Sequence, residues 1–203
     1  MKENYNLLME NEIEGIKEKG SKPTLLLQCC CAPCSSAVLE RLKEHFHLKL
    51  YFYNPNIYPA EEYEKRLSQF DKLLASPDFK EDTEFVTAAY ESEKFDAAAK
   101  GLESEKEGGK RCEACFRLRL FETAKKAKEI GADYFCTTLT VSPHKNSALL
   151  NEIGIEAEKQ YGVKFLYSDF KKKEGYKRST ELSNKLSLYR QNYCGCKYSI
   201  WFE

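Results

Sequence analysis

The sequence lacks any apolar stretch long enough to cross a membrane, and its most apolar run is Leu25-Leu26-Leu27. Such a run suits a short buried strand, whereas a transmembrane helix needs about 20 apolar residues. No secretory signal is visible, because residues 1–4 are polar and acidic after the initial Met. Internal repeats and low-complexity tracts are also missing. We therefore expect a cytoplasmic protein with no membrane partner.

The chain also lacks an excess of charge of either sign, since 32 Lys and Arg balance 32 Asp and Glu. This neutrality argues against broad, nonspecific binding of nucleic acid. The charges are nevertheless unevenly spread. Residues 164–203 hold nine basic against four acidic side chains, and residues 80–109 hold four against nine. The basic C-terminal part is compatible with a polyanionic partner.

A length of 203 residues suits a single domain, with an N-terminal helix at 1–20 and an α/β catalytic core at 21–203. The expected strands are 24–28, 47–53, 84–88, 133–138 and 164–167. The expected helices are 3–19, 35–46, 60–74, 112 or 113 to 130, 146–161 and 179–189. Strands that alternate with helices predict a parallel sheet with helices on both faces. In such sheets the site lies at the carboxyl ends of the strands.

Cysteine is the residue type present in excess, with nine copies. In a reducing compartment, clustered cysteines are more often metal ligands or redox groups than disulfides. Thiolates suit zinc, copper(I) and iron–sulfur clusters. Most of the cysteines fall in three motifs, which are Cys29-Cys30-Cys31-Ala32-Pro33-Cys34, Cys112-Glu113-Ala114-Cys115 and Cys194-Gly195-Cys196. The first motif directly follows the first strand, as the general rule for parallel sheets predicts.

Two of the nine cysteines are interpreted as structural. Cys136 lies within a predicted strand, where a free thiol packs as a small hydrophobe, and Cys29 is expected to point away from its neighbours. Seven cysteines remain. A structural zinc site is the main alternative, but zinc takes four ligands and leaves three thiols without a role. Four thiols for a cubane cluster and three for a second, open site would account for all seven.

Six segments, taken together, resemble the motifs of QueH-type epoxyqueuosine reductases. They are Leu26–Cys34, Tyr53–Pro59 with Glu62, Tyr63 and Arg66, Arg111–Arg119, Thr137–Lys145, Asp169–Lys172 and Leu188–Cys196. The segments occur in order from about residue 25 to 198, so only the N-terminal helix falls outside the resemblance. The sequence departs from the family at Gln28, where the family commonly has His. Gln cannot titrate near neutral pH, so the resemblance carries no proton role to this position.

The resemblance implies a cobalamin-independent oxidoreductase of tRNA maturation with a nucleotide-binding-like three-layer sandwich fold. Such enzymes remove the epoxide oxygen of epoxyqueuosine in the tRNA anticodon loop, giving queuosine and water. The implied cofactors are a [4Fe–4S] cluster and, beside it, a second metal or a redox-active cysteine pair. The implied partners are tRNA carrying epoxyqueuosine and an external low-potential electron donor.

The seven cysteines are divided between these two centres as follows. The predicted ligands of the [4Fe–4S] cluster are Cys30, Cys31, Cys112 and Cys115. The predicted second, catalytic site consists of Cys34, Cys194 and Cys196. With a second iron, this site could act as a Lewis acid on the epoxide oxygen. Without a metal, the last two thiols could cycle between dithiol and disulfide.

The predicted substrate-binding residues follow the later strands or lie in the matched segments. They are Tyr53, Asn54, Asn56, Tyr58, Arg66, Ser142, His144, Lys145, Lys172 and Arg190. Aromatic rings can stack on an unstacked base, and a strand-to-helix turn can bind phosphate. The alternatives are a plain turn at 53–58, a capping or surface role for His144, and a solvated charge run at 171–178. His45 and His47 are interpreted as structural.

Two rival functions come from other classes. A nucleotide-dependent tRNA thiolase would need a Ser-Gly-Gly-x-Asp-Ser loop for pyrophosphate after the first strand. Residues 29–34 occupy that place without any glycine, which disfavours ATP use. A zinc-stabilised RNA-binding module is the other candidate, and metal and sulfide analysis of the purified protein distinguishes it from an iron–sulfur enzyme.

Overall fold

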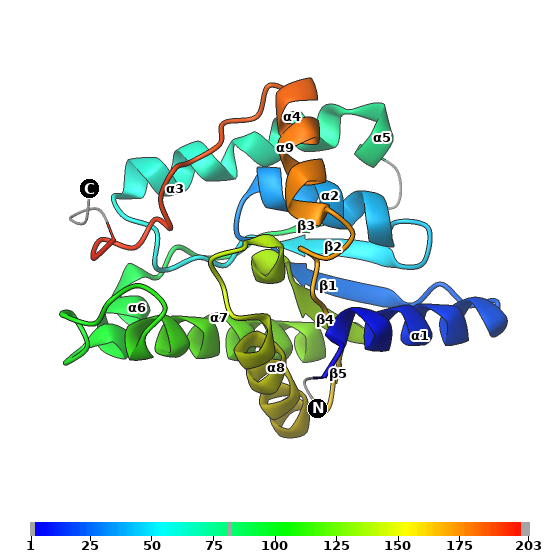
Figure 1. Ribbon diagram of the computed structural model, residues 1–203, viewed down its shortest axis with the longest axis horizontal. Helices are drawn as coiled ribbons and strands as arrows, with labels where there is room; N and C mark the ends of the chain where they lie inside the picture. The colour runs from blue at the N-terminus through cyan, green and yellow to red at the C-terminus, as the bar shows by residue number, and fades with distance from the viewer. Residues whose placement is uncertain (1–2, 81–82, 200–203) are drawn as a thin grey trace.

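A five-stranded parallel sheet forms the centre of the protein in this computed structural model, which describes residues 3–80 and 83–199 (Figure 1). The strands are β1 (Thr24–Gln28), β2 (His47–Tyr51), β3 (Thr83–Val86), β4 (Tyr134–Thr137) and β5 (Lys164–Phe165), in the order β3-β2-β1-β4-β5. The predicted α/β fold with a parallel sheet and flanking helices is confirmed. Residues 1–2, 81–82 and 200–203, which the predicted domain bounds include, lie outside the described residues.

The leucines of β1 explain why this strand is central. Leu25, Leu26 and Leu27 are all fully buried. Successive side chains of a strand point to opposite faces, so Leu25 and Leu27 enter one apolar core and Leu26 enters the other. Burial on both faces is the usual condition of parallel strands, and it produces a continuous apolar run in place of alternation.

Helices cover both faces of the sheet. They are α1 (Tyr5–Glu18), α2 (Ala32–Leu42), α3 (Ala60–Leu67), α4 (Gln69–Ala75), α5 (Pro77–Lys80), α6 (Ser92–Ala99), α7 (Lys110–Glu129), α8 (Ser147–Tyr161) and α9 (Gly175–Lys185). Helices α1, α2, α4 and α9 share the core of Leu25 and Leu27, whereas α7 and α8 share the core of Leu26. Within the described ranges, no helix combines the length and the apolar character needed to span a membrane.

The helix boundaries differ from the predicted ones where local chemistry overrides periodicity. Helix α2 begins at Ala32, before the predicted residue 35, because the Cys31 sulfur accepts the Cys34 N–H as a cap and Pro33 suits a first helical turn. The last helix covers 175–185, not 179–189, and it follows two residues with positive φ, Lys173 and Glu174. The expected helix 60–74 is two helices, and α6 was not predicted.

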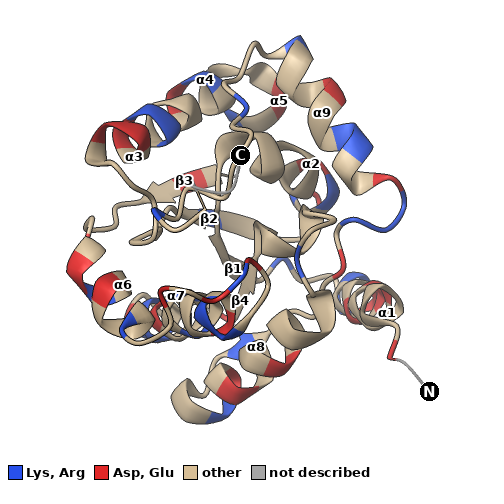
Figure 2. Ribbon diagram, turned by 60° about the vertical axis from the view of Figure 1, so that its left-hand side comes forward, with Lys and Arg blue, Asp and Glu red and all other residues tan. Residues whose placement is uncertain are grey.

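The strand order places a switch point between β1 and β4. The chain extends the sheet from β1 through β2 to β3, and it then returns to the other side of β1 to form β4. Crevices for ligands form at such points, outside the carboxyl ends of the strands. The C-terminal segment returns to this end of the molecule (Figure 2), where Cys196 forms an antiparallel bridge with Ile57.

The close contact between α8 and β5 gives a test of the packing. A Cβ at Gly154 would come within 2.5 Å of the Phe165 ring. We expect Gly154→Ala to lower the free energy of unfolding by about 1–3 kcal/mol, because overpacking strains a filled core. Gly15 on α1 has no neighbour within 4 Å, so Gly15→Ala should instead stabilise by up to about 1 kcal/mol. Urea unfolding midpoints measure both, and equal effects would contradict the described packing.

Candidate metal and substrate site

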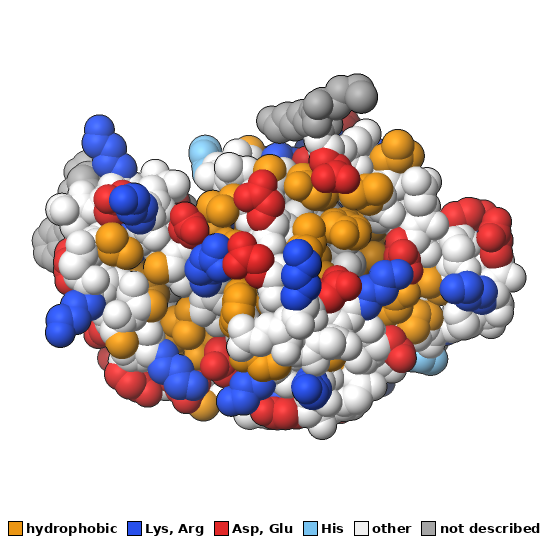
Figure 3. Space-filling model, turned by 90° about the horizontal axis from the view of Figure 1, so that it is seen from below, with side chains coloured by type: hydrophobic (Ala, Val, Ile, Leu, Met, Phe, Trp, Pro, Cys, Tyr) orange, Lys and Arg blue, Asp and Glu red, His pale blue; other side chains and the backbone are white. Residues whose placement is uncertain are grey.

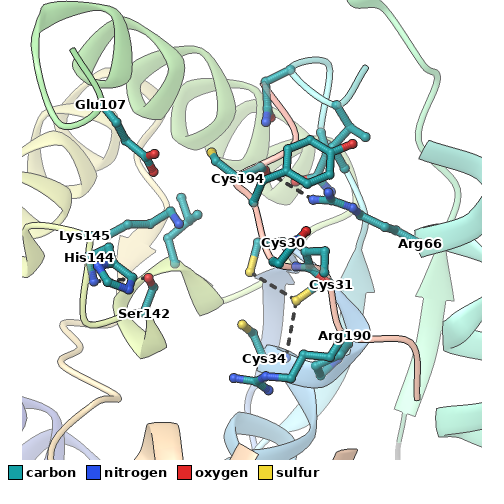
Figure 4. Close-up of a pocket in the computed structure, with 18 of the residues that line it drawn as sticks. Cys30, Cys31, Cys34, Arg66, Glu107, Ser142, His144, Lys145, Arg190 and Cys194 are labelled. Atoms are coloured by element: carbon teal, nitrogen blue, oxygen red, sulfur yellow. Dashed lines mark hydrogen bonds between the residues drawn. The ribbon is translucent and has the colours of Figure 1, made fainter. Parts of the chain in front are cut away.

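A cavity of about 620 Å³ opens at the carboxyl ends of β1 and β4. Cys30, Cys31 and Cys34, which follow β1, form one wall, and residues 142–145, which follow β4, face them (Figure 4). The C-terminal segment 190–194 completes the enclosure. The cavity therefore gathers three segments that are far apart in the sequence, since residues 30–34 precede residues 142–145 by more than a hundred positions and residues 190–194 follow about 45 positions later.

The three thiols of the first motif lie within 4.8 Å of one another. The Cys30 and Cys31 sulfurs are 3.9 Å apart, and the Cys34 backbone N–H donates to the Cys31 sulfur at 3.4 Å. The Thr138 hydroxyl donates to the Cys30 sulfur at 3.3 Å and accepts from the Cys30 backbone N–H at 2.9 Å. This spacing suits thiolates that share one metal ion.

The three thiols do not share their protons equally. Hydrogen bonds from Cys31 and then Cys34 lower the pKa of Cys30 well below its usual value. The hydrogen bond between Cys31 and Cys30 raises the pKa of Cys31 to about 12, and a separate hydrogen bond between Cys34 and Cys30 is the largest cause of the raised pKa of Cys34. The three thiols therefore hold one thiolate readily, and a second deprotonation is disfavoured unless a cation binds.

The other four motif cysteines form a second group beside the cavity. Cys115 and Cys196 are buried together in an apolar cluster, and Cys194 packs against it. Burial raises the pKa of Cys112, Cys115 and Cys196, and the charge of Cys194 raises each of them further. The Gly108 N–H donates to the Cys112 sulfur at 3.2 Å. Cys194 thus lies within electrostatic reach of the other three thiols of the group.

The structure places the seven thiols in two spatial groups that cut across the predicted division, and which group holds which centre stays a prediction. The predicted cluster ligands combined the first two motifs, whereas Cys112 and Cys115 lie with Cys194 and Cys196. The predicted second site joined Cys34 to the C-terminal pair, whereas Cys34 lies with Cys30 and Cys31. The cause is helix α7, whose first two turns point Cys112 and Cys115 toward the returning C-terminal segment.

Two cations lie between the thiol groups. Burial acts to lower the pKa of the Lys145 ammonium, but the charges of Cys194, Cys30 and Cys34 outweigh it and raise that pKa. The Arg119 guanidinium is buried, and its charge favours the thiolate forms of both Cys30 and Cys115. Both side chains offset the negative charge that deprotonated thiols would bring to this end of the sheet.

A buried polar network supports the floor of the cavity. The Gln28 side-chain amide donates to the Tyr53 carbonyl at 3.0 Å and to Asn54 Oδ1 at 3.3 Å, and its oxygen accepts from the Thr137 hydroxyl at 2.8 Å. Asn54 Nδ2 donates to the Cys29 carbonyl at 2.8 Å, and Asn54 Oδ1 also accepts from Arg119 Nη2. The ends of β1, β2 and β4 are tied together in this way.

Several polar atoms around the cavity are buried without a hydrogen-bond partner among the described residues. They are Asn56 Oδ1, Arg66 Nη2, Arg119 Nε and Gln191 Oε1. An unpaired buried polar atom costs about 1–3 kcal/mol, and such atoms are rare in folded proteins. Four of them on one cavity indicate that a polar ligand completes the site.

The C-terminal motif is held by a tight turn against α3. Gly195 has a φ of +97°, and its carbonyl accepts the Tyr58 N–H at 2.8 Å. Arg66 Nη1 donates to the Cys194 carbonyl at 3.2 Å, and Arg66 Nε pairs with Glu62 at 2.7 Å. Figure 4 shows Arg66 and Cys194 side by side at one end of the cavity.

Most of the predicted substrate-binding residues line the cavity. They are Asn54, Asn56, Arg66, Ser142, His144, Lys145 and Arg190. Tyr53 does not, because its ring is buried and stacks on Tyr51 in the opposite core. Tyr58 is exposed outside the cavity lining, and Lys172 lines a smaller cavity beside α2 and α9.

The basic run at 171–178 is largely neutralised by neighbouring carboxylates. Lys171 pairs with Asp169 at 2.8 Å, and Lys177 pairs with Glu174 at 3.3 Å. The other pairs are Lys173 with Glu10, and Arg178 with Glu40 and Glu181. This pattern is the solvated face that the sequence left open as an alternative.

Six polar or aromatic lining residues were missed, namely Glu107, Arg119, Tyr176, Gln191, Asn192 and Tyr193. Arg119 is the last residue of a matched segment, and both Gln191 and Tyr193 lie within another, so these segments carried the signal. Glu107 lies in the expected loop 104–110, and no local pattern marks it or Tyr176.

The two cysteines left out of the site are core residues, as predicted. Cys29 is fully buried with its sulfur 3.3 Å from the Leu27 carbonyl, and burial raises its pKa. Cys136 is also fully buried, 3.2 Å from the Leu166 carbonyl, and burial raises its pKa to about 12. Both thiols pack in the core of Leu25 and Leu27.

Comparison with known proteins gives consistent matches along the chain. The profile of the family described as "Epoxyqueuosine reductase QueH" matches residues 25–201. Three similar proteins carry the name epoxyqueuosine reductase QueH. The one from Streptococcus pyogenes serotype M1 is 42% identical over 198 residues, which cover 97% of this chain and 78% of that protein. The one from Staphylococcus epidermidis is 43% identical over 202 residues (97% and 84%), and the one from Thermotoga maritima is 39% identical over 181 residues (87% and 90%).

The turn at Gly195 provides a test of how the C-terminal thiols are positioned. A Cβ there would lie 2.8 Å from Arg66 Nη1, and the positive φ disfavours any other residue. We expect Gly195→Ala to cost about 1–3 kcal/mol of local strain and to lower the metal content of the reconstituted protein. Gly101 also has a positive φ (+78°) but no neighbour within 4 Å, so Gly101→Ala should keep its metal. Equal metal content in both variants would contradict this role of the turn.

Proposed function

Because this chain belongs to the epoxyqueuosine reductase QueH family, we propose that it reduces epoxyqueuosine in tRNA to queuosine. Membership of the family makes the protein an oxidoreductase. The observation that carries the proposal is a cavity lined by one group of three thiols and, through Cys194, reached by a second group beside it. Four buried polar atoms of its lining have no partner among the described residues. A structural zinc site would need only four of these seven thiols.

The reaction needs two electrons and two protons. Both C–O bonds of the epoxide break, a carbon–carbon double bond forms, and the oxygen leaves as water. An external low-potential donor supplies the electrons, and the protons come through groups that line the cavity. We further propose that the reaction takes place in the cytoplasm, where thiols remain reduced.

We assign the [4Fe–4S] cluster to Cys112, Cys115, Cys194 and Cys196. Each iron of a cubane takes one thiolate, so its four ligands stand further apart than ligands of a single ion. The apolar surroundings of this group and its position beside the cavity fit such a cluster. When bound, the cluster supplies single electrons at low potential.

We assign the second centre to Cys30, Cys31 and Cys34. Three thiols within 4.8 Å of one another fit a single metal with one open position. The low pKa of Cys30 prepares one ligand, and an entering cation would deprotonate the others. A metal here would act as a Lewis acid on the epoxide oxygen.

The side chains opposite the thiols bind and orient the substrate in this proposal. The Lys145 ammonium lies within electrostatic reach of both thiol groups, so it can donate a hydrogen bond to the oxygen as negative charge develops on it. The unpaired Asn56 Oδ1 and Gln191 Oε1 can accept hydrogen bonds from the substrate. Arg66 Nη2 and Arg119 Nε also have no partner among the described residues, and they can donate hydrogen bonds to the substrate.

Turnover of modified tRNA tests the proposed function directly. We expect the anaerobically reconstituted protein, given an artificial low-potential donor, to convert epoxyqueuosine tRNA to queuosine tRNA. Mass spectrometry of the digested nucleosides should show the loss of one oxygen atom. Reactions without the donor are the control. A protein that holds stoichiometric zinc without acid-labile sulfide, and that gives no product, would contradict the proposal.

Single cysteine variants distinguish the two thiol groups. We expect Cys196→Ala to lose acid-labile sulfide and visible absorption, because the cubane loses a ligand. Cys31→Ala should keep its sulfide but lose turnover, because only the second centre is damaged. The control Cys136→Ala, a buried thiol in the core, should keep both. Loss of sulfide in Cys31→Ala, together with retained sulfide but lost turnover in Cys196→Ala, would instead support the division predicted from the sequence.

A further inference from the structure

A row of positive side chains stacks on tyrosine rings at the cavity rim and next to it. Each pair joins the C-terminal segment 189–193 to α3 or α9. The pairs are Lys65 with Tyr189 at 3.6 Å, Arg66 with Tyr193 at 5.0 Å and Arg190 with Tyr176 at 5.0 Å, measured to the ring centroid. Four of these six side chains line the cavity, namely Arg66, Tyr176, Arg190 and Tyr193.

Tyr176 differs from the other two tyrosines in its exposure. It lies in the first turn of α9, lines the cavity, and leaves 42% of its surface exposed. Tyr189 and Tyr193 are less exposed, and their hydroxyls are engaged by Glu62 and by the Tyr58 carbonyl. Of the three tyrosine rings, that of Tyr176 is thus the most accessible to a flat ligand.

Arg190 carries a positive charge without a carboxylate partner among the described residues. Its Nη1 meets the hydroxyls of Ser179 and Ser183, both at 3.4 Å. Arg178, on the same helix as these serines, is instead held by two carboxylates. The Arg190 guanidinium, which lies beside Cys34 in Figure 4, therefore remains able to bind an anion.

Other surfaces offer less to a polyanion. On the face seen from below, where α6, α7 and α8 lie, basic and acidic side chains are intermixed (Figure 3). The basic run at 171–178 is also mostly paired with carboxylates. At the cavity rim, by contrast, Arg190 has no carboxylate partner among the described residues and adjoins the exposed ring of Tyr176.

We propose that Tyr176 and Arg190 form a clamp for the nucleotide adjacent to the one being reduced. The Tyr176 ring stacks on the neighbouring base, and the Arg190 guanidinium binds the intervening phosphate. This inference rests on the proposed function, since it takes the ligand to be a single-stranded RNA loop. Proteins read such loops by stacking splayed bases on aromatic rings and guanidinium planes. A free nucleoside lacks both the neighbouring base and the intervening phosphate that the clamp would hold.

The binding of an anticodon stem–loop RNA to the reconstituted protein tests the clamp. We expect Tyr176→Ala to raise Kd roughly 5- to 150-fold, the usual effect of removing one stacked base, and to raise KM more than it lowers kcat. Tyr176→Phe should bind like the wild type, because it keeps the ring. The control Leu7→Ala removes a similarly exposed apolar side chain (50%) from α1 and should change nothing.

The charge of Arg190 has its own readout. Arg190→Gln should lower the slope of log Kd against log salt concentration by about 0.7, as expected for one lost phosphate contact to a single strand. Lys125→Gln, which removes an exposed charge on α7, should leave that slope unchanged. An unchanged slope in Arg190→Gln would overturn the phosphate contact.

An RNA-side experiment keeps the stacking contact testable even if a protein variant folds poorly. A stem–loop with an abasic neighbour should bind the wild type as weakly as the intact RNA binds Tyr176→Ala. Combining the two changes should weaken binding no further. Additive effects, or equal binding by Tyr176→Ala and the wild type, would overturn the clamp. Absence of turnover by the wild type would overturn the proposed function instead, and the binding results would still stand on their own.

Discussion

The site depends on the hydrogen bonds of the Gln28 side chain, because they link three adjacent strands where these strands end. Its amide reaches the Tyr53 carbonyl after β2 and the Thr137 hydroxyl at the end of β4, while its own residue ends β1. Buried polar groups of this kind must be paired, so the segments that follow the strands have one arrangement. The amide makes these bonds without titrating, so the network does not depend on pH through this side chain.

The segments that follow these strands hold seven thiols in two groups, with cations between the groups. Seven thiols near one another would resist deprotonation, because each thiolate raises the pKa of its neighbours. Lys145 and Arg119, which both line the cavity, offset that repulsion, and Arg119 is itself fixed by Asn54 of the floor network. The same network that shapes the cavity thus also sets its charge.

The fold could be predicted from the sequence because its signals are local, whereas the grouping of the cysteines could not. The apolar run of β1 and the alternation of elements are visible in short windows, and they place the first cysteine motif at a strand end. Which distant motif meets which is decided by the start of α7 at Lys110 and by the turn at Gly195, and spacing encodes neither. The burial of Tyr53 was within reach, since it follows Tyr51 by two residues and therefore faces the same side.

Net charge gave little guidance to the binding surface, and the ion pairs explain why. Most exposed Lys and Arg side chains of residues 171–178 are held by carboxylates, so they add little to the potential that an RNA would meet. A chain with zero net charge can still present positive charge locally, wherever a cation is paired with an aromatic ring or a hydroxyl in place of a carboxylate. Arg190 satisfies that condition at the cavity rim, where it meets the Tyr176 ring and the Ser179 hydroxyl. In such a protein the partners of each cation locate the polyanion site better than the count of charges does.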